Sequence, residues 1–378
     1  MAVLEATGII LDSTRQPLSR RVAFFTSLCP LHDGTILCAA QQGAAKHAPT
    51  SSLWLGRSTD GGQTWTALPW NWTTRLGDIP GSLSGAELVE SEPGRLLLFA
   101  TWFNRQDPDR PLFDPQTEGL LRSRQLLAES RDGGASWSDW RQVPTGTLRG
   151  TALTGPVLHW PSGLLAFPFE SFKEYDDTSP KQHGSWVIIS RDGGTAFSEP
   201  LLVAQDPDHR IYYWDQRLCA TGDDGEFLAM FWTHDLTIKK DLDVHQCWGR
   251  ITGSRIVTSE CQSARIPGQI AAPVQLANGR LAALVVSREH PGTITLWCSH
   301  DRGRTWPDDQ KLVIYRHDQR HNRNLGVVEV EYGEYWNEML QWSFGHPALR
   351  SLDADHLLLA WYAGTPDALS LHWARVRV

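Results

Sequence analysis

Three carboxylates sit in or beside apolar segments, where a carboxylate is costly unless it is paired or faces a polar pocket. Glu87 lies inside the run SGAELVES, Glu170 ends the run LLAFPFES, and Asp215 follows an aromatic run. Each is therefore a candidate acid, base or nucleophile, the groups that glycoside cleavage needs in pairs. Asp215 and Arg217 share one face of a strand, so a structural salt bridge is the competing interpretation.

His346 in WSFGHPALRSL is the fourth catalytic candidate, as a hydrogen-bond or proton-transfer partner, with a core histidine as the alternative. A further set could bind a substrate, because arginine forks bind carboxylates and Trp and Tyr faces hold sugar rings. These candidates are Arg21, His47, Trp102, Arg124, Tyr213, Trp214, Arg217, Gln269 and Arg288. We expect no metal site and no cofactor, since no ligand spacing or cofactor motif is present.

Four similar octapeptides recur along the chain, and they indicate the kind of repeated scaffold that positions these side chains. They read STDGGQTW, SRDGGASW, SRDGGTAF and SHDRGRTW, with aspartates at 60, 132, 192 and 301. One active site does not need four copies, so we interpret the aspartates as acceptors for backbone N–H groups in tight glycine turns. The last gap, 301−192=109 residues, is about twice the others, which predicts one unit without the motif.

Each unit follows the same order: an apolar strand, a tight turn, a second apolar strand, a loop and a third strand that enters the octapeptide. Short strands at regular spacing predict an all-β repeat fold, a six-bladed β-propeller with four-stranded antiparallel blades. We expect one domain over residues 1–378, with the N-terminal strand 4–11 closing the last blade and covering its edge. The predicted blades are 18–70, 83–142, 151–203, 211–258, 266–314 and 342–378 plus 4–11.

The octapeptide resembles the Asp-box, or bacterial neuraminidase repeat, of the six-bladed sialidases, over about residues 18–378. The resemblance implies that the octapeptides and the glycine turns share one face of the propeller. It also implies that the candidate site residues converge on the central axis at the opposite face. The motif identifies a fold more than a function, because it also occurs in lyases and noncatalytic propellers.

The sequence departs from the sialidase pattern at three places. The family's Phe-Arg-Ile-Pro motif is absent. By resemblance, Arg21 in SRRVA stands where the family has the arginine of that motif, the first of three that bind a carboxylate. The loop QQGAAKHAPTSS has no carboxylate where the family has its acid/base aspartate, which leaves His47, Lys46 or another blade to serve. His346 stands where we would look for the family's tyrosine, for which Tyr335 or Tyr213 could substitute.

Composition and charge limit the kinds of ligand that the protein is expected to bind. The net charge of −8 argues against nucleic acid or an anionic membrane as the main ligand. The N-terminus shows no basic start followed by an apolar segment, so we expect no signal peptide and a cytoplasmic protein. The six cysteines include no CxxC pair, and we expect buried thiols rather than a disulfide. Oligomeric state is left open.

These observations lead to one main hypothesis: a sialidase-like, carbohydrate-active enzyme. It would be an exo-acting glycoside hydrolase on an acidic or modified sugar, with carboxylates as acid and base and arginines as substrate clamps. Two alternatives stay open. One is a noncatalytic glycan- or protein-binding propeller, and the other is a polysaccharide lyase with a His or Tyr base.

Overall fold

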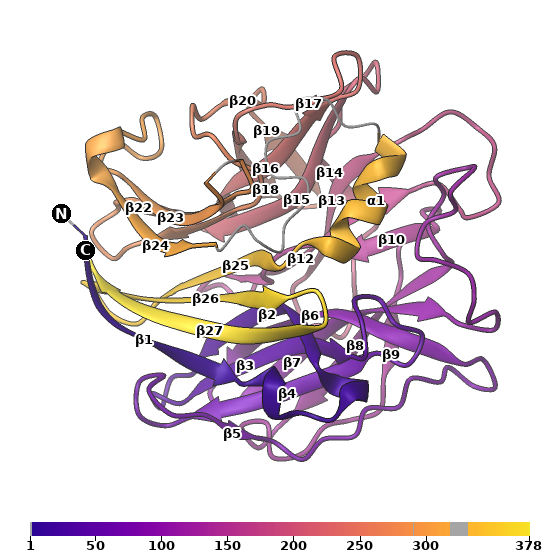
Figure 1. Ribbon diagram of the computed structural model, residues 1–378. Helices are drawn as coiled ribbons and strands as arrows, with labels where there is room; N and C mark the ends of the chain where they lie inside the picture. Colours follow the sequence, from indigo (N-terminus) through magenta and orange to yellow (C-terminus); the bar gives the residue numbers. More distant parts are fainter. Residues whose placement is uncertain (1, 290, 318–331) are drawn as a thin grey trace.

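The computed structural model describes residues 2–289, 291–317 and 332–378, and this part of the chain is nearly all β-structure (Figure 1). The described residues form one α-helix, α1 (Tyr332–Gln341), and three short 3-10 helices at Ser13–Arg15, Leu18–Arg20 and Asp308–Gln310. No described helix is long and apolar enough to cross a membrane. The sequence pattern did not predict α1, which spans only ten residues.

The strands form five sheets of mainly antiparallel strands. The largest sheet joins β2 (Val22–Pro30), β3 (Ile36–Gly43), β4 (Ser52–Ser58) and β5 (Thr66–Ala67) to β25 (Phe344–Ser351), β26 (His356–Thr365), β27 (Ala368–Arg377) and β1 (Val3–Leu11). The second contains β6 (Gly81–Glu92), β7 (Arg95–Asn104), β8 (Ser123–Ser130) and β9 (Arg141–Val143), and the third contains β10 (Gly150–Leu153), β11 (Leu158–His159), β12 (Leu165–Phe172), β13 (Gly184–Ser190) and β14 (Leu201–Ala204). The fourth contains β15 (Ile211–Ala220), β16 (Glu226–Asp235), β17 (Lys240–Asp241), β18 (His245–Thr252), β19 (Arg255–Thr258) and β20 (Gln262–Ser263), and the fifth contains β21 (Ala271–Gln275), β22 (Leu281–Ser287), β23 (Thr293–Ser299) and β24 (Lys311–Arg316).

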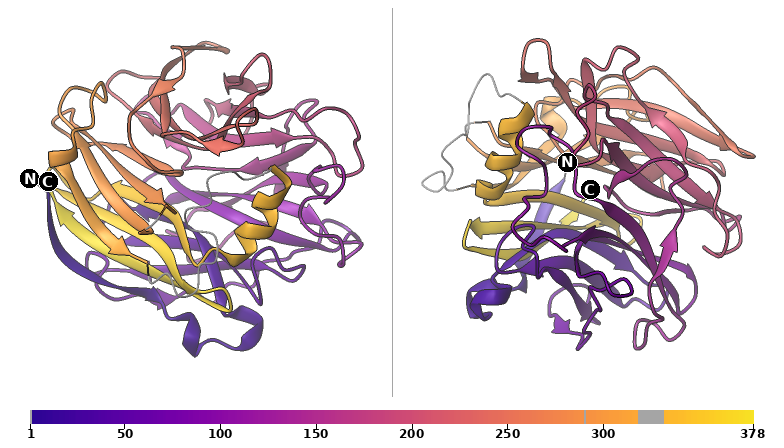
Figure 2. Two further views of the ribbon diagram at one scale, coloured as in Figure 1. Left: turned by 45° about the horizontal axis from the view of Figure 1, so that its top comes forward. Right: turned by 90° about the vertical axis from the view of Figure 1, so that its right-hand side faces the viewer.

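The two ends of the chain meet. The expected pairing of the N-terminal strand is present: β1 runs antiparallel to β27, with Val3 opposite Arg377 and Leu11 opposite Leu371. Figures 1 and 2 show the termini side by side. A single parallel contact between Val22 and Leu369 joins the β2–β5 strands to the β25–β27 strands. Because β1 occupies the outer side of β27, that strand presents no free edge.

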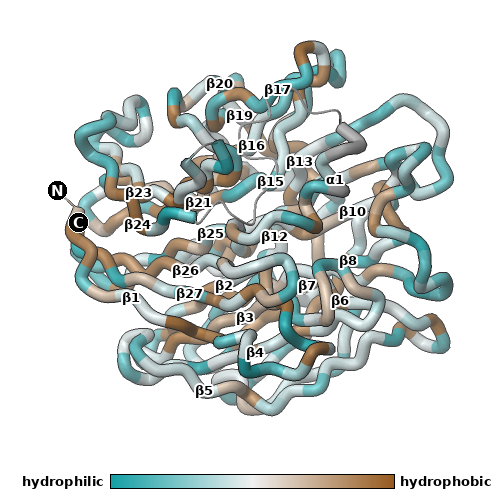
Figure 3. Tube along the Cα trace, viewed as in Figure 1, coloured by the Kyte–Doolittle hydropathy of each residue, from teal (hydrophilic) through white to brown (hydrophobic). Residues whose placement is uncertain are grey.

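The core lies between neighbouring sheets, where each second strand presents alternate residues to the sheets on its two sides. Leu96 and Leu98 of β7 pack toward β3 and β4, while Leu97 and Phe99 pack toward β12. In Figure 3 the apolar residues, in brown, lie mainly along the strands, and the polar residues, in teal, lie mainly in the loops. Each fully buried Leu or Phe contributes roughly 1.5–3 kcal/mol.

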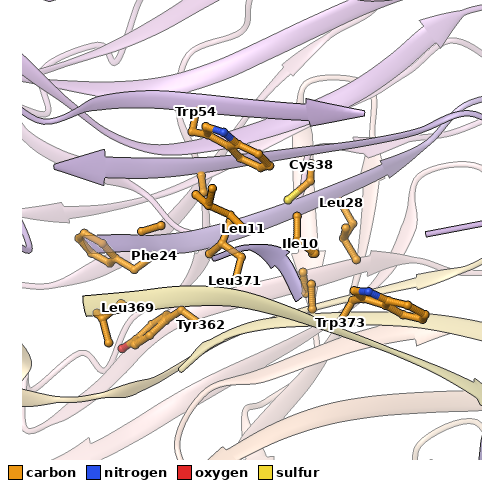
Figure 4. Close-up of a cluster of buried hydrophobic side chains, with 14 of the residues drawn as sticks. Ile10, Leu11, Phe24, Leu28, Cys38, Trp54, Tyr362, Leu369, Leu371 and Trp373 are labelled. Atoms are coloured by element: carbon orange, nitrogen blue, oxygen red, sulfur yellow. The ribbon is translucent and has the colours of Figure 1, made fainter. Parts of the chain in front are cut away.

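The last strands pack on the first in the same way. Ile10 and Leu11 of β1, Leu371 and Trp373 of β27 and Leu28 of β2 belong to one buried cluster (Figure 4). Segments from both ends of the sequence thus share one core.

The four octapeptides have a common hydrogen-bonding pattern. Asp60 Oδ1 accepts from Ser58 Oγ at 2.8 Å and from the backbone N–H of Gln63 and Thr64, both at 2.9 Å. The Ser–Asp bond recurs at Asp132, Asp192 and Asp301. The hydroxyl and backbone N–H of Thr64 hold the pKa of Asp60 at about 2. These local bonds support the scaffolding interpretation of the motif.

The six cysteines, all within the described residues, are free thiols. Cys29 and Cys38 belong to two different buried clusters and therefore point to opposite faces of their hairpin.

Candidate functional site

A cavity opens at the strand ends opposite the octapeptides. In the pairing of β7 with β8, Ser130 at the start of an octapeptide lies opposite Leu96, and Ser123 at the other end lies opposite Phe103. Phe103 and Thr101 line the cavity, which encloses about 800 Å³ of empty space, part of it open to solvent. Its titratable lining residues are His47, Glu170, Asp215, Tyr335 and His346.

Four inner strands reach this cavity through the same local irregularity. Phe25 (φ 56°), Gly85 (φ 61°), Asp215 (φ 48°) and His346 (φ 49°) have left-handed backbones, and all four line the cavity. At each of them the pairing with the next strand shifts register. A bulge re-aims the side chain that it carries, and left-handed non-glycine residues concentrate at functional sites. Two of these four bulges thus present Asp215 and His346 to the cavity.

Glu170, near the end of β12, is the more deeply buried of the two lining carboxyl groups. Its Oε1 accepts from the backbone N–H of Gln216 at 3.3 Å, and its Oε2 lies 3.4 Å from His183 Nε2. Burial raises the pKa of Glu170 above its ordinary value, against the opposing effect of His183. A carboxyl group with a raised pKa keeps its proton nearer to neutral pH, as a general acid requires.

Asp215 is ion-paired with a buried arginine. Its Oδ1 lies 2.6 Å from Nη2 of Arg217, whose side chain is almost completely buried beneath the cavity. Glu87 does not line the cavity. It lies with Arg217 and Arg350 around a smaller enclosed space, where Ser27 Oγ donates to it at 2.7 Å. Burial raises the pKa of Glu87, while Arg350 and Arg217 lower it.

Two cavity histidines are held in the neutral form. Burial lowers the pKa of His47 to about 3, with Lys46 and Arg105 adding to the effect. Burial likewise lowers the pKa of His346 well below its ordinary value, and Arg217 contributes. Among the described residues, Nδ1 of His346 and both ring nitrogens of His47 have no hydrogen-bond partner. Neutral imidazoles with free nitrogens can donate to or accept from a ligand.

Tyr335 brings a second network to the cavity wall. Its hydroxyl donates to Asp241 Oδ1 at 2.8 Å and lies 3.1 Å from His234 Nδ1, which is itself 3.0 Å from Asp241 Oδ1. His234 and Asp241 are opposite residues of the β16–β17 hairpin. Burial raises the pKa of the Tyr335 hydroxyl, and Asp241 adds to this. From the sequence, Tyr335 was only a possible substitute for the family's tyrosine, and Asp241 was not a candidate. The short β16–β17 hairpin is the one local signal that could have predicted the contact between Asp241 and His234.

Helix α1 presents Tyr335 and Met339 to the cavity, one helical turn apart. Buried Lys46 fastens the end of this helix to the loop after β3. Its Nζ donates to the carbonyl oxygens of Met339 at 2.8 Å and Trp342 at 2.6 Å, and to the Tyr362 hydroxyl at 3.2 Å. Burial lowers the pKa of Lys46 well below its ordinary value, and Arg288 adds to the effect, so its role is to donate hydrogen bonds to carbonyl groups at the end of the helix that lack a partner within it.

Arg288 and Gln269 lie behind the cavity wall. The Arg288 guanidinium stacks 3.9 Å from the centroid of Trp342 and 5.8 Å from that of Trp232, a lining residue. Its Nε and Nη1 have no hydrogen-bond partner in the part of the chain that the structure describes. Gln269 accepts from the Arg288 backbone N–H at 2.8 Å and donates to Asp241 at 3.3 Å.

The sequence-predicted site residues therefore divide into three groups. Glu170, Asp215, His346, His47 and Trp214 line the cavity. Glu87, Arg217, Gln269 and Arg288 lie behind it. Arg21, Trp102, Arg124 and Tyr213 do not line it.

These last four side chains have local contacts instead. Arg21 Nε donates to Gln16 O, and Arg124 donates to Ser123 O. Trp102 donates to Thr74 O and covers the backbone of β6, while Tyr213 packs on Phe231. Among the described residues, no group of three or more His, Cys, Asp or Glu side chains could hold a metal ion.

Comparisons with known proteins place the fold. No family model and no curated protein matches the chain. Among solved structures it is similar to a protein of unknown function from Dyadobacter fermentans, with 16% identity and a TM-score of 0.72 over 100% of this chain and 99% of that one. It is also similar to the Hadza microbial sialidase Hz136, with 15% identity and a TM-score of 0.70 over 99% and 69% of the two chains.

A further similar structure is the Penicillium chrysogenum α-L-arabinanase complexed with arabinobiose, with 12% identity and a TM-score of 0.64 over 99% and 98% of the two chains. Identities this low show a shared fold alone. The nearly all-β fold of this chain is thus one that also serves β-propeller glycosidases.

Proposed function

We propose that the protein is a six-bladed β-propeller of the Asp-box type and an exo-acting glycoside hydrolase on a modified, uncharged sugar, because no Lys or Arg is among the described residues that line the cavity. The observation that carries the proposal is that two carboxyl groups, Glu170 and Asp215, line one cavity. The fold that holds them is shared with a sialidase and an arabinanase. A cavity enclosed on several sides suits an enzyme that acts on a terminal residue. The packing of the last strands on the first supports a closed ring of blades.

In this proposal Glu170 donates a proton to the leaving-group oxygen. Burial gives it the raised pKa that a general acid needs. Asp215, ion-paired with Arg217, is the group that stabilises or captures the oxocarbenium-like centre. Trp214 and Trp232 supply flat faces for a sugar ring, and neutral His346 hydrogen-bonds to a hydroxyl group.

The test is hydrolysis of a panel of aryl glycosides, including an aryl sialoside, by the wild type and matched variants. Glu170→Gln and Asp215→Asn should each lower kcat by about 100-fold or more on the one substrate that the wild type cleaves. Glu87→Gln is the control, because Glu87 lies outside the cavity. Equal activity in all three folded variants would remove the proposed roles, and no turnover on any glycoside would favour a binding propeller.

A second candidate function, a polysaccharide lyase, is favoured by the network of Tyr335, Asp241 and His234. The raised pKa keeps Tyr335 protonated, so it would act as the base that a lyase needs only after its hydroxyl proton has passed to Asp241 or His234, its two hydrogen-bond partners. In a hydrolase, Tyr335 would instead act as the nucleophile, with Asp241 or His234 accepting its proton. A lyase would release unsaturated products that absorb in the ultraviolet, whereas a hydrolase would not. Tyr335→Phe should abolish the lyase reaction, or a hydrolysis that uses Tyr335 as the nucleophile, but not a hydrolysis that Glu170 and Asp215 carry out.

A further inference from the structure

The cavity has two chemically different halves. Three of its five titratable lining residues, Asp215, Tyr335 and His346, come from the β15 and β25 strands and from α1. The opposite half carries six apolar side chains from the second and third sheets and from the segment that joins β7 to β8, alongside the uncharged polar residues Ser84, Thr101 and Thr154. The six apolar residues are Phe103, Leu112, Phe113, Leu120, Leu153 and Phe172. No Lys or Arg is among the described residues that line either half.

The apolar half is built into the fold rather than formed by a loose loop. Leu121 N donates to Leu112 O at 2.9 Å, which closes the joining segment on itself. Leu120 N donates to Lys173 O at 2.9 Å, which attaches the segment to the end of β12. Phe103, Phe113 and Leu120 form a buried cluster against which Phe172 packs. The wall is therefore preorganised for an apolar group.

The proton donor proposed above lies at the boundary between the halves. Glu170 and Phe172 are two residues apart on β12, so their side chains share one face of the strand. A leaving group that receives a proton from Glu170 would therefore extend toward Phe172 and the apolar wall.

We infer that the apolar half is the subsite for an uncharged, apolar leaving group, such as an aryl or alkyl aglycone. The substrate class is thus a glycoside of an apolar alcohol or phenol rather than a link between two polar sugars. An anionic group there would lose its hydration without gaining a cationic partner among the described lining residues, and would approach Glu170 and Asp215. This inference rests on the proposed function for the direction of the leaving group.

The first experiment needs no turnover. Titration calorimetry at about pH 6.5 compares 2-naphthol, which is uncharged there, with 2-naphthoate, which is ionised. We expect 2-naphthol to bind at least about tenfold more tightly than 2-naphthoate. In Leu112→Gln, which places an amide in a partly exposed position of the wall, 2-naphthol should bind at least about fivefold more weakly. Leu202→Gln, at a residue 42% exposed and outside the cavity, should bind as the wild type does.

Equal affinity for the two probes, no binding of 2-naphthol, or full affinity in Leu112→Gln would each overturn the inference. These outcomes do not depend on catalysis, so failure of the proposed hydrolase would leave the binding result intact. Once a cleaved sugar is known, Leu112→Gln should lower kcat/KM for its aryl glycoside and leave that for its methyl glycoside unchanged. An equal loss on both substrates would contradict the assignment to the leaving group.

Discussion

At the scale of single residues, Glu170 shows how environment gives one carboxyl group a special role. It shares the cavity with Asp215, yet it is buried beside a backbone N–H and an imidazole, whereas Asp215 is held by a guanidinium. The apolar sequence around Glu170 pointed to it. The same reasoning also selected Glu87, which lies at a smaller space outside the cavity. An apolar strand pattern shows that a carboxyl group is buried, but it does not show which space the group faces.

The raised pKa of Glu170 predicts a pH dependence of stability. The folded protein holds this proton more tightly than the unfolded chain, whose glutamates titrate near 4.5. The stabilisation is therefore fully present below about pH 4.5 and is lost as the pH rises through the folded pKa. Urea unfolding should show that Glu170→Gln gains stability relative to the wild type between acid and neutral pH. The exposed variant Glu260→Gln should show no such trend, and parallel curves for Glu170→Gln and the wild type would contradict the prediction.

At the scale of elements, the cavity depends on two features that local sequence patterns hide. The bulges place Phe25, Asp215 and His346 in a left-handed conformation that their side chains disfavour, and only Gly85 marks such a position in the sequence. Helix α1 is short, and Lys46, the residue that fastens it, lies far away in the chain. The strands were easier to predict, because apolar runs and glycine turns are local signals.

Removing the attachment of α1 should loosen the cavity wall. Lys46→Met leaves the carbonyl groups of Met339 and Trp342 without this donor, which should cost about 1–3 kcal/mol of unfolding free energy. Faster hydrogen exchange should be confined to α1 and its contacts. Lys311→Met, which removes an exposed surface pair, should change stability by less than about 1 kcal/mol. Unchanged exchange in α1 would show that other contacts hold the helix.

A glycine pair tests the bulge. Gly85→Ala and Gly279→Ala both place a side chain in a left-handed conformation, at about 1–2 kcal/mol each. Only the new methyl at Gly85 meets a neighbour, Leu153 Cδ2 at 3.1 Å, while that at Gly279 meets nothing within 4 Å. Thermal unfolding should therefore show a larger loss for Gly85→Ala. Equal losses would mean that Leu153 moves freely, and that the bulge tolerates a larger residue.

At the scale of the whole molecule, the packing of the last strands on the first holds the sheets together. The sequence predicted this partnership, because the N-terminal strand was left over once the other strands had been grouped. The cavity wall from α1 and the β16–β17 hairpin was not predicted, since Tyr335 and Asp241 meet only through tertiary packing.

Deleting residues 2–11 should expose the edge of β27 together with Leu371 and Trp373. We expect a lower melting temperature and self-association through the free edge, measured by calorimetry and by light scattering after size exclusion. Ile9→Thr, at a side chain 50% exposed on the outer side of β1, should remain close to the wild type in both measurements. A truncated chain that stays monomeric and equally stable would contradict this role of β1.

The pairing of β1 with β27 also sets an order of events during synthesis. A ribosome makes β1 long before β27, so β1 leaves the exit tunnel without its partner. Units in the middle of the chain, whose strands are close together in sequence, can form while translation continues. The sheet that contains both β1 and β27 must wait for the end of the chain, and during that interval a chaperone has an unpaired strand to protect.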